Sequence, residues 1–179
     1  MLDREGHLFL VDFGLAKELH SEEDYAESFL STPLYLAPER FTGSGSINFK
    51  SDVYGVGCVF YQILHARPPF RGSNYHSLAQ HIQEDVPEFR ADLPPDHLSF
   101  LLSTLEKDPQ RRLAGMSRHR MFRETDWTLV GGRKGKGVRV DHVESGSVQI
   151  NYEIDEDYNE ETYPSRLIGQ WEFGCEQPS

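Results

Sequence analysis

The spacing of apolar residues along the chain predicts a mainly α-helical protein with one short extended segment near its start. Residues 7–11 form an aliphatic and aromatic run that suits a β-strand, and the turn-forming residues 3–6 precede it. We therefore expect half of a β-hairpin here, with a partner strand that would lie before residue 2. Residues 15–50 read as irregular, because Ser, Thr, Gly and Pro are interspersed throughout.

The strongest helical signal covers residues 51–64, for which Ser51 and Asp52 offer an N-cap. Gly55 and Gly57 each cost about 1 kcal/mol relative to alanine inside a helix, so packing must override local propensity there. The apolar residues cover nearly the whole helical circumference, which predicts a buried helix. They are Val53, Tyr54, Val56, Val59, Phe60, Ile63 and Leu64.

Two further helices are predicted after the stop signal at residues 67–70. A short one covers residues 77–82, and a longer one runs from about residue 96 to residue 107, after a pair of prolines. The longer helix places four leucines on one face at positions i, i+3, i+4 and i+7. These are Leu98, Leu101, Leu102 and Leu105.

Charge and composition limit the classes of function. The 179 residues carry a formal net charge of -11, which argues against nucleic acid or an anionic membrane surface as the main partner. No apolar run approaches about 18 residues, and residues 1–6 lack the regions of a secretory signal, so we expect an intracellular, cytoplasmic protein with no membrane span. Cys58 and Cys175 have no metal-binding spacing and are expected to be reduced thiols.

The chain divides by composition into one domain and a tail. Residues 1–127 hold the periodic segments and can bury one core. Residues 128–179 carry no clear helix, and their five basic against ten acidic residues predict a solvated, irregular and acidic extension.

Several short motifs follow one another in a fixed order. They are Asp12-Phe13-Gly14, Ala37-Pro38-Glu39, the run from Asp52 to Gly57, Pro68-Pro69-Phe70, and the run from Asp108 to Leu113. Together they resemble the C-terminal lobe of protein kinases, over residues 2–127. Residues 6–8, 15–17 and 121–127 are similar to the AGC group of serine/threonine kinases. The resemblance implies a protein-kinase-like C-terminal lobe fragment with a residual hairpin and an irregular extension.

The first motif implies a cofactor site. The Asp12 carboxylate matches the residue that binds Mg²⁺ on the phosphates of ATP in this family. Gly14 allows a backbone geometry that other residues resist. Phe13, by resemblance, packs beneath the site.

The irregular segment that follows resembles a kinase activation segment. Ser28 matches the position that carries an activating phosphate in AGC kinases, which implies an upstream activating kinase as a partner. An exposed loop serine without such a role is the alternative. Lys17 matches one of the cations that pair with this phosphate. Thr32 matches the threonine that hydrogen-bonds the catalytic aspartate of serine/threonine kinases.

Three further residues match structural positions of the family. Glu39 and Arg112 correspond to a carboxylate and guanidinium pair that ties the activation segment to the lobe. Asp52 resembles the residue that holds the catalytic-loop backbone by hydrogen bonds. A buried carboxylate that lacks those donors is destabilising.

The protein substrate expected from the resemblance differs from the family's usual one. AGC kinases favour basic peptides through acidic side chains around the peptide groove. Leu34 and Gln62 stand where the family has glutamate. A preference for arginine upstream of the phosphorylated residue is therefore not expected.

The motif that supplies the catalytic base, H-R-D-x-x-x-x-N, does not occur in the 179 residues. Met1-Leu2-Asp3 matches the end of the family's N-I-M-L-D, which would place the metal-binding asparagine and the catalytic base upstream of Met1. One hypothesis is the C-terminal portion of an ATP-dependent serine/threonine kinase that is inactive alone. A catalytically dead lobe that acts as an interaction or regulatory module is the alternative, and a mis-set start codon is a third possibility.

Overall fold

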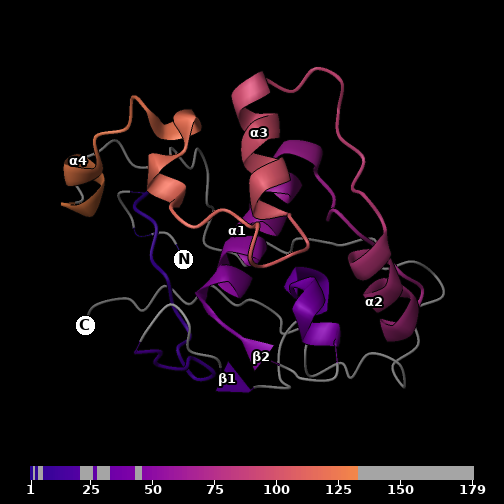
Figure 1. Ribbon diagram of the computed structural model, residues 1–179. Helices are drawn as coiled ribbons and strands as arrows, with labels where there is room; N and C mark the ends of the chain where they lie inside the picture. Colours follow the sequence, from indigo (N-terminus) through magenta and orange to yellow (C-terminus); the bar gives the residue numbers. More distant parts are fainter. Residues whose placement is uncertain (2, 4–5, 21–25, 28–32, 43–45, 133–179) are drawn as a thin grey trace, which may run out of the picture.

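The computed structural model describes residues 1, 3, 6–20, 26–27, 33–42 and 46–132, which form a mainly helical lobe (Figure 1). This confirms the predicted fold class in its coarse form. The described α-helices are α1 (Phe49–His65), α2 (Tyr75–Glu84), α3 (Pro95–Thr104) and α4 (Trp127–Gly131). The short 3-10 helices are η1 (Pro33–Tyr35), η2 (Pro38–Phe41), η3 (Met116–Arg118) and η4 (Arg120–Phe122).

A two-residue antiparallel pairing lies beside the start of α1. Strand β1 (Ala26–Glu27) pairs with β2 (Ser46–Ile47), with Ala26 opposite Ile47. This short sheet connects two distant parts of the segment that was predicted to be irregular. It places the chain that leads into α1 next to residues about twenty positions earlier.

The N-cap of α1 is Asn48, three residues before the predicted cap, Ser51. The side chain of Asn48 accepts a hydrogen bond from the Lys50 amide at 3.0 Å, and the Ser51 hydroxyl accepts one from the Asn48 amide at 3.4 Å. Ser51 is therefore the third residue of a capping box, and its prediction as the N-cap is wrong. At the other end Ala66 adopts a left-handed conformation, with φ of 54°, and its amide bonds the Gln62 carbonyl.

Helices α2 and α3 also differ from the predicted ranges. Helix α2 extends beyond residues 77–82 at both ends, because Asn74 and Ser77 form a second capping box. Helix α3 ends at Thr104 instead of about residue 107, and Leu105 forms its C-cap. The turn after it is needed to bring the following segment back against α1.

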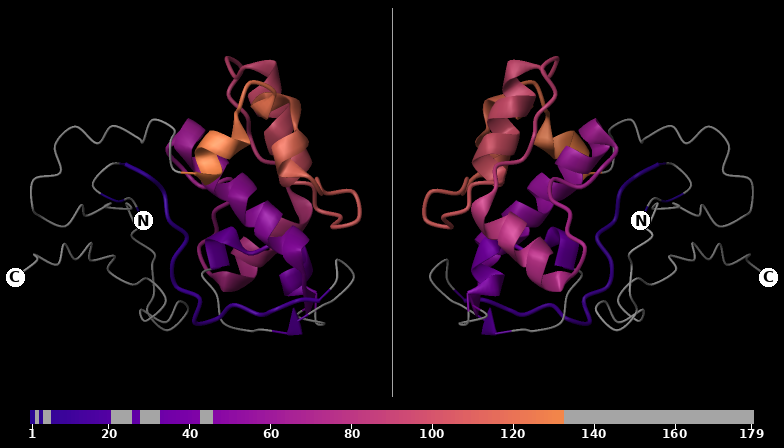
Figure 2. Two further views of the ribbon diagram at one scale, coloured as in Figure 1. Left: turned by 90° about the vertical axis from the view of Figure 1, so that its left-hand side faces the viewer. Right: turned by 90° about the vertical axis from the view of Figure 1, so that its right-hand side faces the viewer.

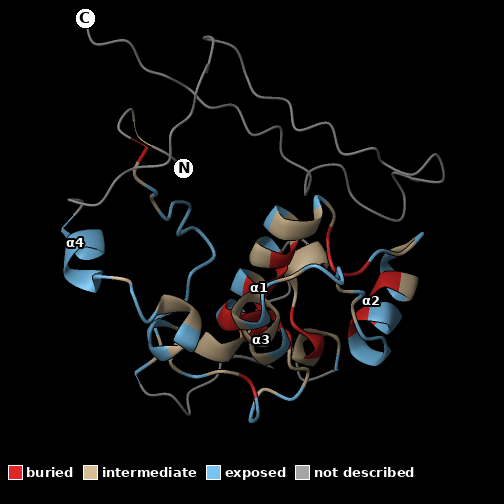
Figure 3. Cartoon of the chain, turned by 90° about the horizontal axis from the view of Figure 1, so that it is seen from above, coloured by how far each residue is buried: buried red, intermediate tan, exposed pale blue. Residues whose placement is uncertain are grey.

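The core lies where α1 and α3 cross, and α2 packs on the segment that precedes α1 (Figures 1 and 3). Gly57 makes the crossing close, since a Cβ built there would lie 2.6 Å from the Thr104 hydroxyl oxygen. The main buried cluster contains residues from all three helices. Its members are Ala37, Tyr54, Cys58, Tyr61, Phe70, Leu78, Ile82, Leu101 and Leu105.

The prediction that α1 is buried on all sides is wrong. Val56, Val59 and Ile63 lie on one exposed face of the helix, while Val53, Tyr54, Gly57, Cys58 and Tyr61 are buried. On α3, Leu102 is likewise exposed, although its position suited the predicted apolar face. Both helices thus expose apolar side chains to solvent on the sides that no described element covers.

The chain before residue 20 runs beside the helical body and apart from it (Figure 2). Met1 and Phe9 exchange two backbone hydrogen bonds, at 2.7 and 2.8 Å, around a turn in which the Asp3 carboxylate accepts from the His7 amide. No strand is assigned over the described part of residues 6–20, where only Leu8 holds an isolated bridge. The hairpin therefore remains a prediction.

A search of the described residues for membrane spans finds no helix whose length and apolar character would allow it to cross a bilayer.

Candidate functional site

The best-defined polar site is built around Arg112, whose side chain is fully buried. Its terminal nitrogens donate to the two carboxylate oxygens of Glu39 at 2.7 and 2.8 Å. The remaining donors bond the backbone carbonyls of Glu106, Lys50 and Lys107, at 2.8, 2.9 and 3.1 Å. All five N–H groups of the guanidinium thus have an acceptor, which is what burial of this cation requires.

The partner carboxylate is held in its ionised form. Burial acts to raise the pKa of Glu39, but the hydrogen bond and positive charge of Arg112 lower it more, so that the net pKa lies below its usual value. The Ser51 hydroxyl adds a further hydrogen bond at 2.9 Å. Glu39 belongs to η2 and Ser51 to α1, so one carboxylate joins η2, α1 and the segment after α3.

The segment that contains η1 and η2 is docked on α1 at a second point. The Tyr35 hydroxyl donates to the side-chain oxygen of Gln62 at 2.9 Å. Leu34 and Tyr35 are half-buried and pack against the core. The neutral amide of Gln62 and the aliphatic Leu34 therefore stand at the two positions where the kinase resemblance implies acidic side chains.

Asp12 stands apart from this anchored region. It is exposed, its φ is 65°, and its carboxylate accepts a hydrogen bond from the Gly14 amide at 3.4 Å. Phe13 does not pack beneath it, because the Phe13 side chain is 66% exposed. Lys17 is exposed as well. The left-handed backbone falls on Asp12 and not on Gly14, where the sequence predicted unusual geometry.

The residues around Asp12 do not complete a metal site. Mg²⁺ takes six oxygen ligands, of which proteins supply one or two carboxylates. Among the residues that the structure describes, no group of three or more His, Cys, Asp or Glu side chains is arranged to hold a metal ion. Asp12 can offer one carboxylate toward such a site.

Asp52 lies in the first turn of α1, on the exposed face of the helix. Its carboxylate makes no hydrogen bond or ion pair with any described residue. Although the residue as a whole is exposed, partial shielding of the carboxyl from water raises its pKa. The donors that the family resemblance assigns to this position are thus absent from the described part of the chain.

Ser28 and Thr32 lie outside the described residues. Of the other predicted site residues, Glu39 and Arg112 are in direct contact. Gln62 bonds Tyr35, which follows Leu34 in the sequence. Asp12, Lys17 and Asp52 have no acidic or basic partner among the described side chains.

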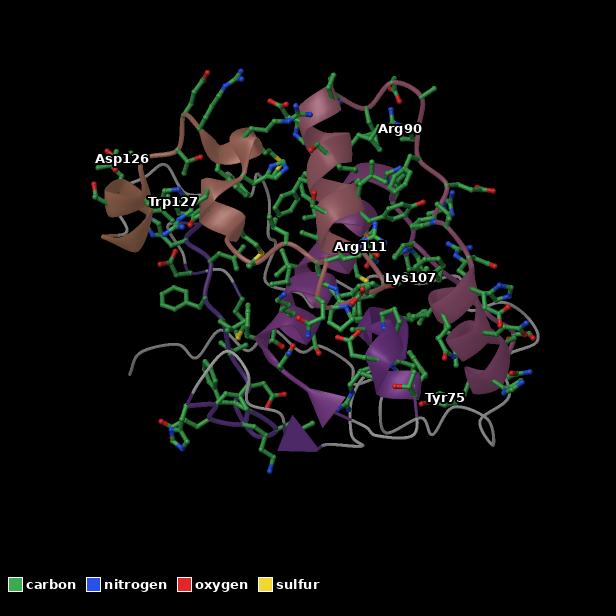
Figure 4. All side chains as sticks on the ribbon, in the orientation of Figure 1. Tyr75, Arg90, Lys107, Arg111, Asp126 and Trp127 are labelled. Carbon is green, nitrogen blue, oxygen red and sulfur yellow. The ribbon has the colours of Figure 1, made fainter. Side chains whose placement is uncertain are left out.

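Lys107 is a residue that sequence reasoning missed. It lies between α3 and α2 (Figure 4), and its ammonium donates to the Ile82 carbonyl and sits 4.5 Å from the centre of the Phe70 ring. Desolvation lowers the pKa of Lys107, and the nearby Asp85 partly opposes that change. Lys107 thus supplies a hydrogen-bond donor to a backbone carbonyl in the last turn of α2. Only its place next to the Asp108 motif could have signalled a role.

His119 is a second such residue. Its Nδ1 accepts from the Met121 amide at 3.2 Å, so the opposite nitrogen carries the proton and bonds the Ser99 hydroxyl at 3.2 Å. Desolvation and the Arg120 charge lower its pKa, against the effect of Asp96. The neutral imidazole therefore links η4 to α3.

Comparisons with known proteins agree with this geometry. The chain belongs to the protein kinase family, because a family model described as the protein kinase domain matches residues 1–126. The motifs that resemble the AGC group of serine/threonine kinases are consistent with the relatives found.

Those relatives are themselves serine/threonine kinases. The chain is 37% identical over 131 residues to a RAC family serine/threonine-protein kinase homolog from Dictyostelium discoideum, which covers 71% of this chain and 29% of that protein. It is 34% identical over 141 residues to human RAC-beta serine/threonine-protein kinase, an alignment that covers 75% of this chain and 29% of that protein. Mouse protein kinase C delta type is 31% identical over 156 residues, an alignment that covers 86% of this chain and 23% of that protein. The chain thus spans less than a third of these relatives' length.

Proposed function

We propose that this chain is the C-terminal lobe portion of an ATP-dependent serine/threonine kinase, the part that carries the activation segment and the peptide-facing surface. The buried pair of Glu39 and Arg112 carries the proposal, since it ties the end of the activation segment to the helical core. The hydrogen bond between Tyr35 and Gln62 supports it at a second point. In this proposal the lobe spans residues 1–127, and residues 128–179 are an acidic extension of an intracellular protein.

On its own, the chain transfers no phosphate in this proposal. The H-R-D-x-x-x-x-N motif is missing from its sequence, and Asp12 is an isolated carboxylate in the described part. Mg²⁺ and ATP would require additional ligands and a catalytic base before the γ-phosphoryl group could pass to a protein hydroxyl. Asp12 would then supply one ligand of the metal.

The substrate surface in this proposal is neutral at two positions. Gln62 bonds Tyr35 through its oxygen, and Leu34 offers no charge. A substrate peptide would gain no ion pair from arginine at these positions. Ser28 is the proposed site for an upstream kinase, with Lys17 as one cation for its phosphate.

A phosphoryl-transfer assay tests the proposal. The 179-residue chain is incubated with radiolabelled ATP, Mg²⁺ and two serine peptides that differ only by arginine upstream of the serine. We expect no incorporation above a reaction without protein. Transfer that disappears in the Asp12→Ala variant and persists in Asp126→Ala would overturn the claim that the chain is inactive alone.

The second candidate is an interaction module without catalytic activity. The exposed apolar face of α1 favours it, because a helix of this kind ordinarily has a partner. This candidate and the first share the same folded lobe, and they differ in whether the lobe binds another polypeptide as its own task.

A further inference from the structure

His65, in the last turn of α1, is held by hydrogen bonds at both of its ring nitrogens. Its Nδ1 lies 3.0 Å from the Tyr61 carbonyl oxygen, which is only an acceptor, so Nδ1 carries a proton. Its Nε2 accepts from the backbone amide of Arg90 at 3.2 Å, so Nε2 carries none. The two contacts define a neutral imidazole in one tautomer, and they join the end of α1 to the connection between α2 and α3, where Arg90 lies (Figure 4).

The His65 ring is also confined by its aromatic neighbours. It stacks on the Tyr61 ring, with the ring centres 3.9 Å apart and an angle of 4° between the planes. The Phe89 ring meets both of them edge-on, at 6.0 Å from Tyr61 and 6.4 Å from His65. Because the rings fix the orientation of the imidazole, a change in its protonation acts on the hydrogen bonds at its two nitrogens.

Residues 88–92 are attached to the end of α1 at two further points. The Tyr61 hydroxyl donates to the Glu88 carbonyl at 2.5 Å. The guanidinium of Arg90 donates to the Leu64 carbonyl at 3.2 Å. The backbone amide of Arg90, in contrast, has no acceptor other than the imidazole among the described residues. Loss of that acceptor would leave the amide unpaired within the junction, which is unfavourable.

We propose that protonation of His65 releases residues 90–92 from the end of α1, so that this junction is a pH-sensitive switch. An imidazolium has an N–H group at each nitrogen. Protonated Nε2 would direct its hydrogen at the Arg90 amide, donor against donor, so the proton and the amide bond exclude each other. Imidazole is the side chain that ordinarily takes up a proton between about pH 5 and pH 8, which sets the range of the switch. Burial raises the pKa of Tyr61, so its hydroxyl stays neutral in that range.

The charged side chains beside the junction form two ion pairs. Arg67 bonds Glu88 at 2.9 Å, and its guanidinium lies 5.8 Å from the centre of the stacked tyrosine ring. Arg90 bonds the two carboxylate oxygens of Asp92 at 2.9 and 2.6 Å. The hydrogen bond from Arg90 holds the pKa of Asp92 below its usual value, and the charge of His65 contributes least to that shift. Each carboxylate is thus already neutralised by a guanidinium, which limits what it can offer an imidazolium.

Protonation loosens one junction and leaves the rest of the lobe folded. The bond from the Tyr61 hydroxyl to the Glu88 carbonyl contains no group that titrates between about pH 5 and pH 8. The same holds for the Ala66 amide, which bonds the Gln62 carbonyl at 2.8 Å in the last turn of α1. The connection between α2 and α3 is therefore tighter at high pH and looser at low pH. The switch operates whether or not the lobe takes part in phosphoryl transfer.

Long-range ¹H–¹⁵N NMR of the 179-residue chain tests the neutral state, because it distinguishes a protonated from a bare ring nitrogen. At about pH 8, above the usual range of imidazole titration, we expect a protonated Nδ1 and a bare Nε2 at His65. A protonated Nε2 at this pH would refute the proposal, because the Arg90 amide could not then donate to it.

Amide hydrogen exchange of the same chain tests the release. The protection factor of the Arg90 amide, corrected for the intrinsic exchange rate, should fall at least about tenfold from about pH 8 to about pH 5. The Ala66 amide is the internal reference, and its protection should change by less than about twofold. No fall at Arg90, or an equal fall at both amides, would rule out a local switch.

Two phenylalanine variants assign the effect to one histidine. His65→Phe keeps a ring against Tyr61 but supplies no acceptor, so the Arg90 amide should be weakly protected at both pH values. His76→Phe is the matched control, since His76 is exposed in the first turn of α2, and it should keep the fall seen in the wild type. A fall that survives in His65→Phe, or is lost in His76→Phe, would overturn the proposal. The wild-type measurements decide it even if His65→Phe does not fold.

Discussion

Glu39 and Arg112 lie 73 residues apart in the sequence and meet through two parallel hydrogen bonds of 2.7 and 2.8 Å. The contact fixes η2 against α1 and against the turn after α3. Because the guanidinium is fully buried and every donor is used, the pair acts as one unit. Removing one partner leaves the other as an unpaired buried charge, which is costly.

Arg112→Met should therefore destabilise the lobe by about 3 kcal/mol or more, because Glu39 and three backbone carbonyls lose their partner. Arg111→Met is the matched control. The neighbouring Arg111, labelled in Figure 4, has an exposed side chain and pairs with Glu106 alone among the described residues, at 3.4 Å, so its loss should cost under about 0.5 kcal/mol. Urea unfolding followed by circular dichroism measures both. Equal costs would show that the buried pair does not stabilise the fold.

The same pair predicts how stability depends on pH. The folded-state pKa of Glu39 lies below its ordinary value of 4.5, so the unfolded chain binds the proton first. The stabilisation is complete above pH 4.5 and is lost as the pH falls through the lower, folded-state pKa. Glu39→Gln should flatten this part of the curve in urea titrations between pH 3 and pH 6. A wild-type slope that survives in the variant would contradict the assignment.

Two glycines of α1 should respond in opposite ways to alanine. Gly57→Ala forces a methyl group to within 2.6 Å of the Thr104 hydroxyl oxygen and 3.0 Å of Leu105, and should cost about 1 to 3 kcal/mol by overpacking. Gly55→Ala meets only the Tyr35 carbonyl oxygen, at an ordinary contact distance of 3.8 Å, and should stabilise by about 1 kcal/mol through helix propensity. Thermal unfolding at low protein concentration compares them. Stabilisation by both alanines would mean that α1 and α3 do not approach closely at Gly57.

Tyr54 predicts a stabilising substitution. Its hydroxyl is buried and has no hydrogen-bond partner among the described residues, while its ring lies 5.1 Å from the Arg112 guanidinium. Tyr54→Phe removes an unsatisfied polar group and should raise stability by about 1 kcal/mol. The control is Tyr61→Phe, which removes the bond to the Glu88 carbonyl and should lower stability by a similar amount. Urea unfolding that destabilises the Tyr54 variant as much as the control would contradict this.

The helices could be predicted from apolar spacing, but their ends could not. Two residues near the start of α1, Asn48 and Ser51, can both cap a helix, and the choice depends on the hydrogen bonds that each makes in the folded chain. The end of α3 depends on the turn that returns Arg112 to the core. Periodicity carries no information about such a turn.

The burial of α1 also differs between the prediction from the sequence and the structure. A helix that is apolar on every side predicts neighbours on every side. The described part of the chain covers one side of α1 and leaves Val56, Val59 and Ile63 exposed. The pattern specifies what the helix can bury, and only the arrangement of neighbours decides what it does bury.

The candidate site could be predicted in part. The motif order pointed to Glu39 and Arg112, whose side chains are in contact, and the backbone carbonyls that complete the site could not be foreseen because every residue carries one. Lys107 and His119 were missed for a similar reason, since a lysine or histidine that bonds a distant backbone group has no local pattern. Asp12 was found by its motif, and its role stays a prediction.

Calorimetric titration of the 179-residue chain with ATP and Mg²⁺ tests the central claim, that the lobe is folded while its nucleotide side is incomplete. The wild type and the Asp12→Ala variant should give the same small heats, without saturation up to about 1 mM ATP. Saturable binding by the wild type that is absent in Asp12→Ala would show a usable nucleotide site and contradict the account.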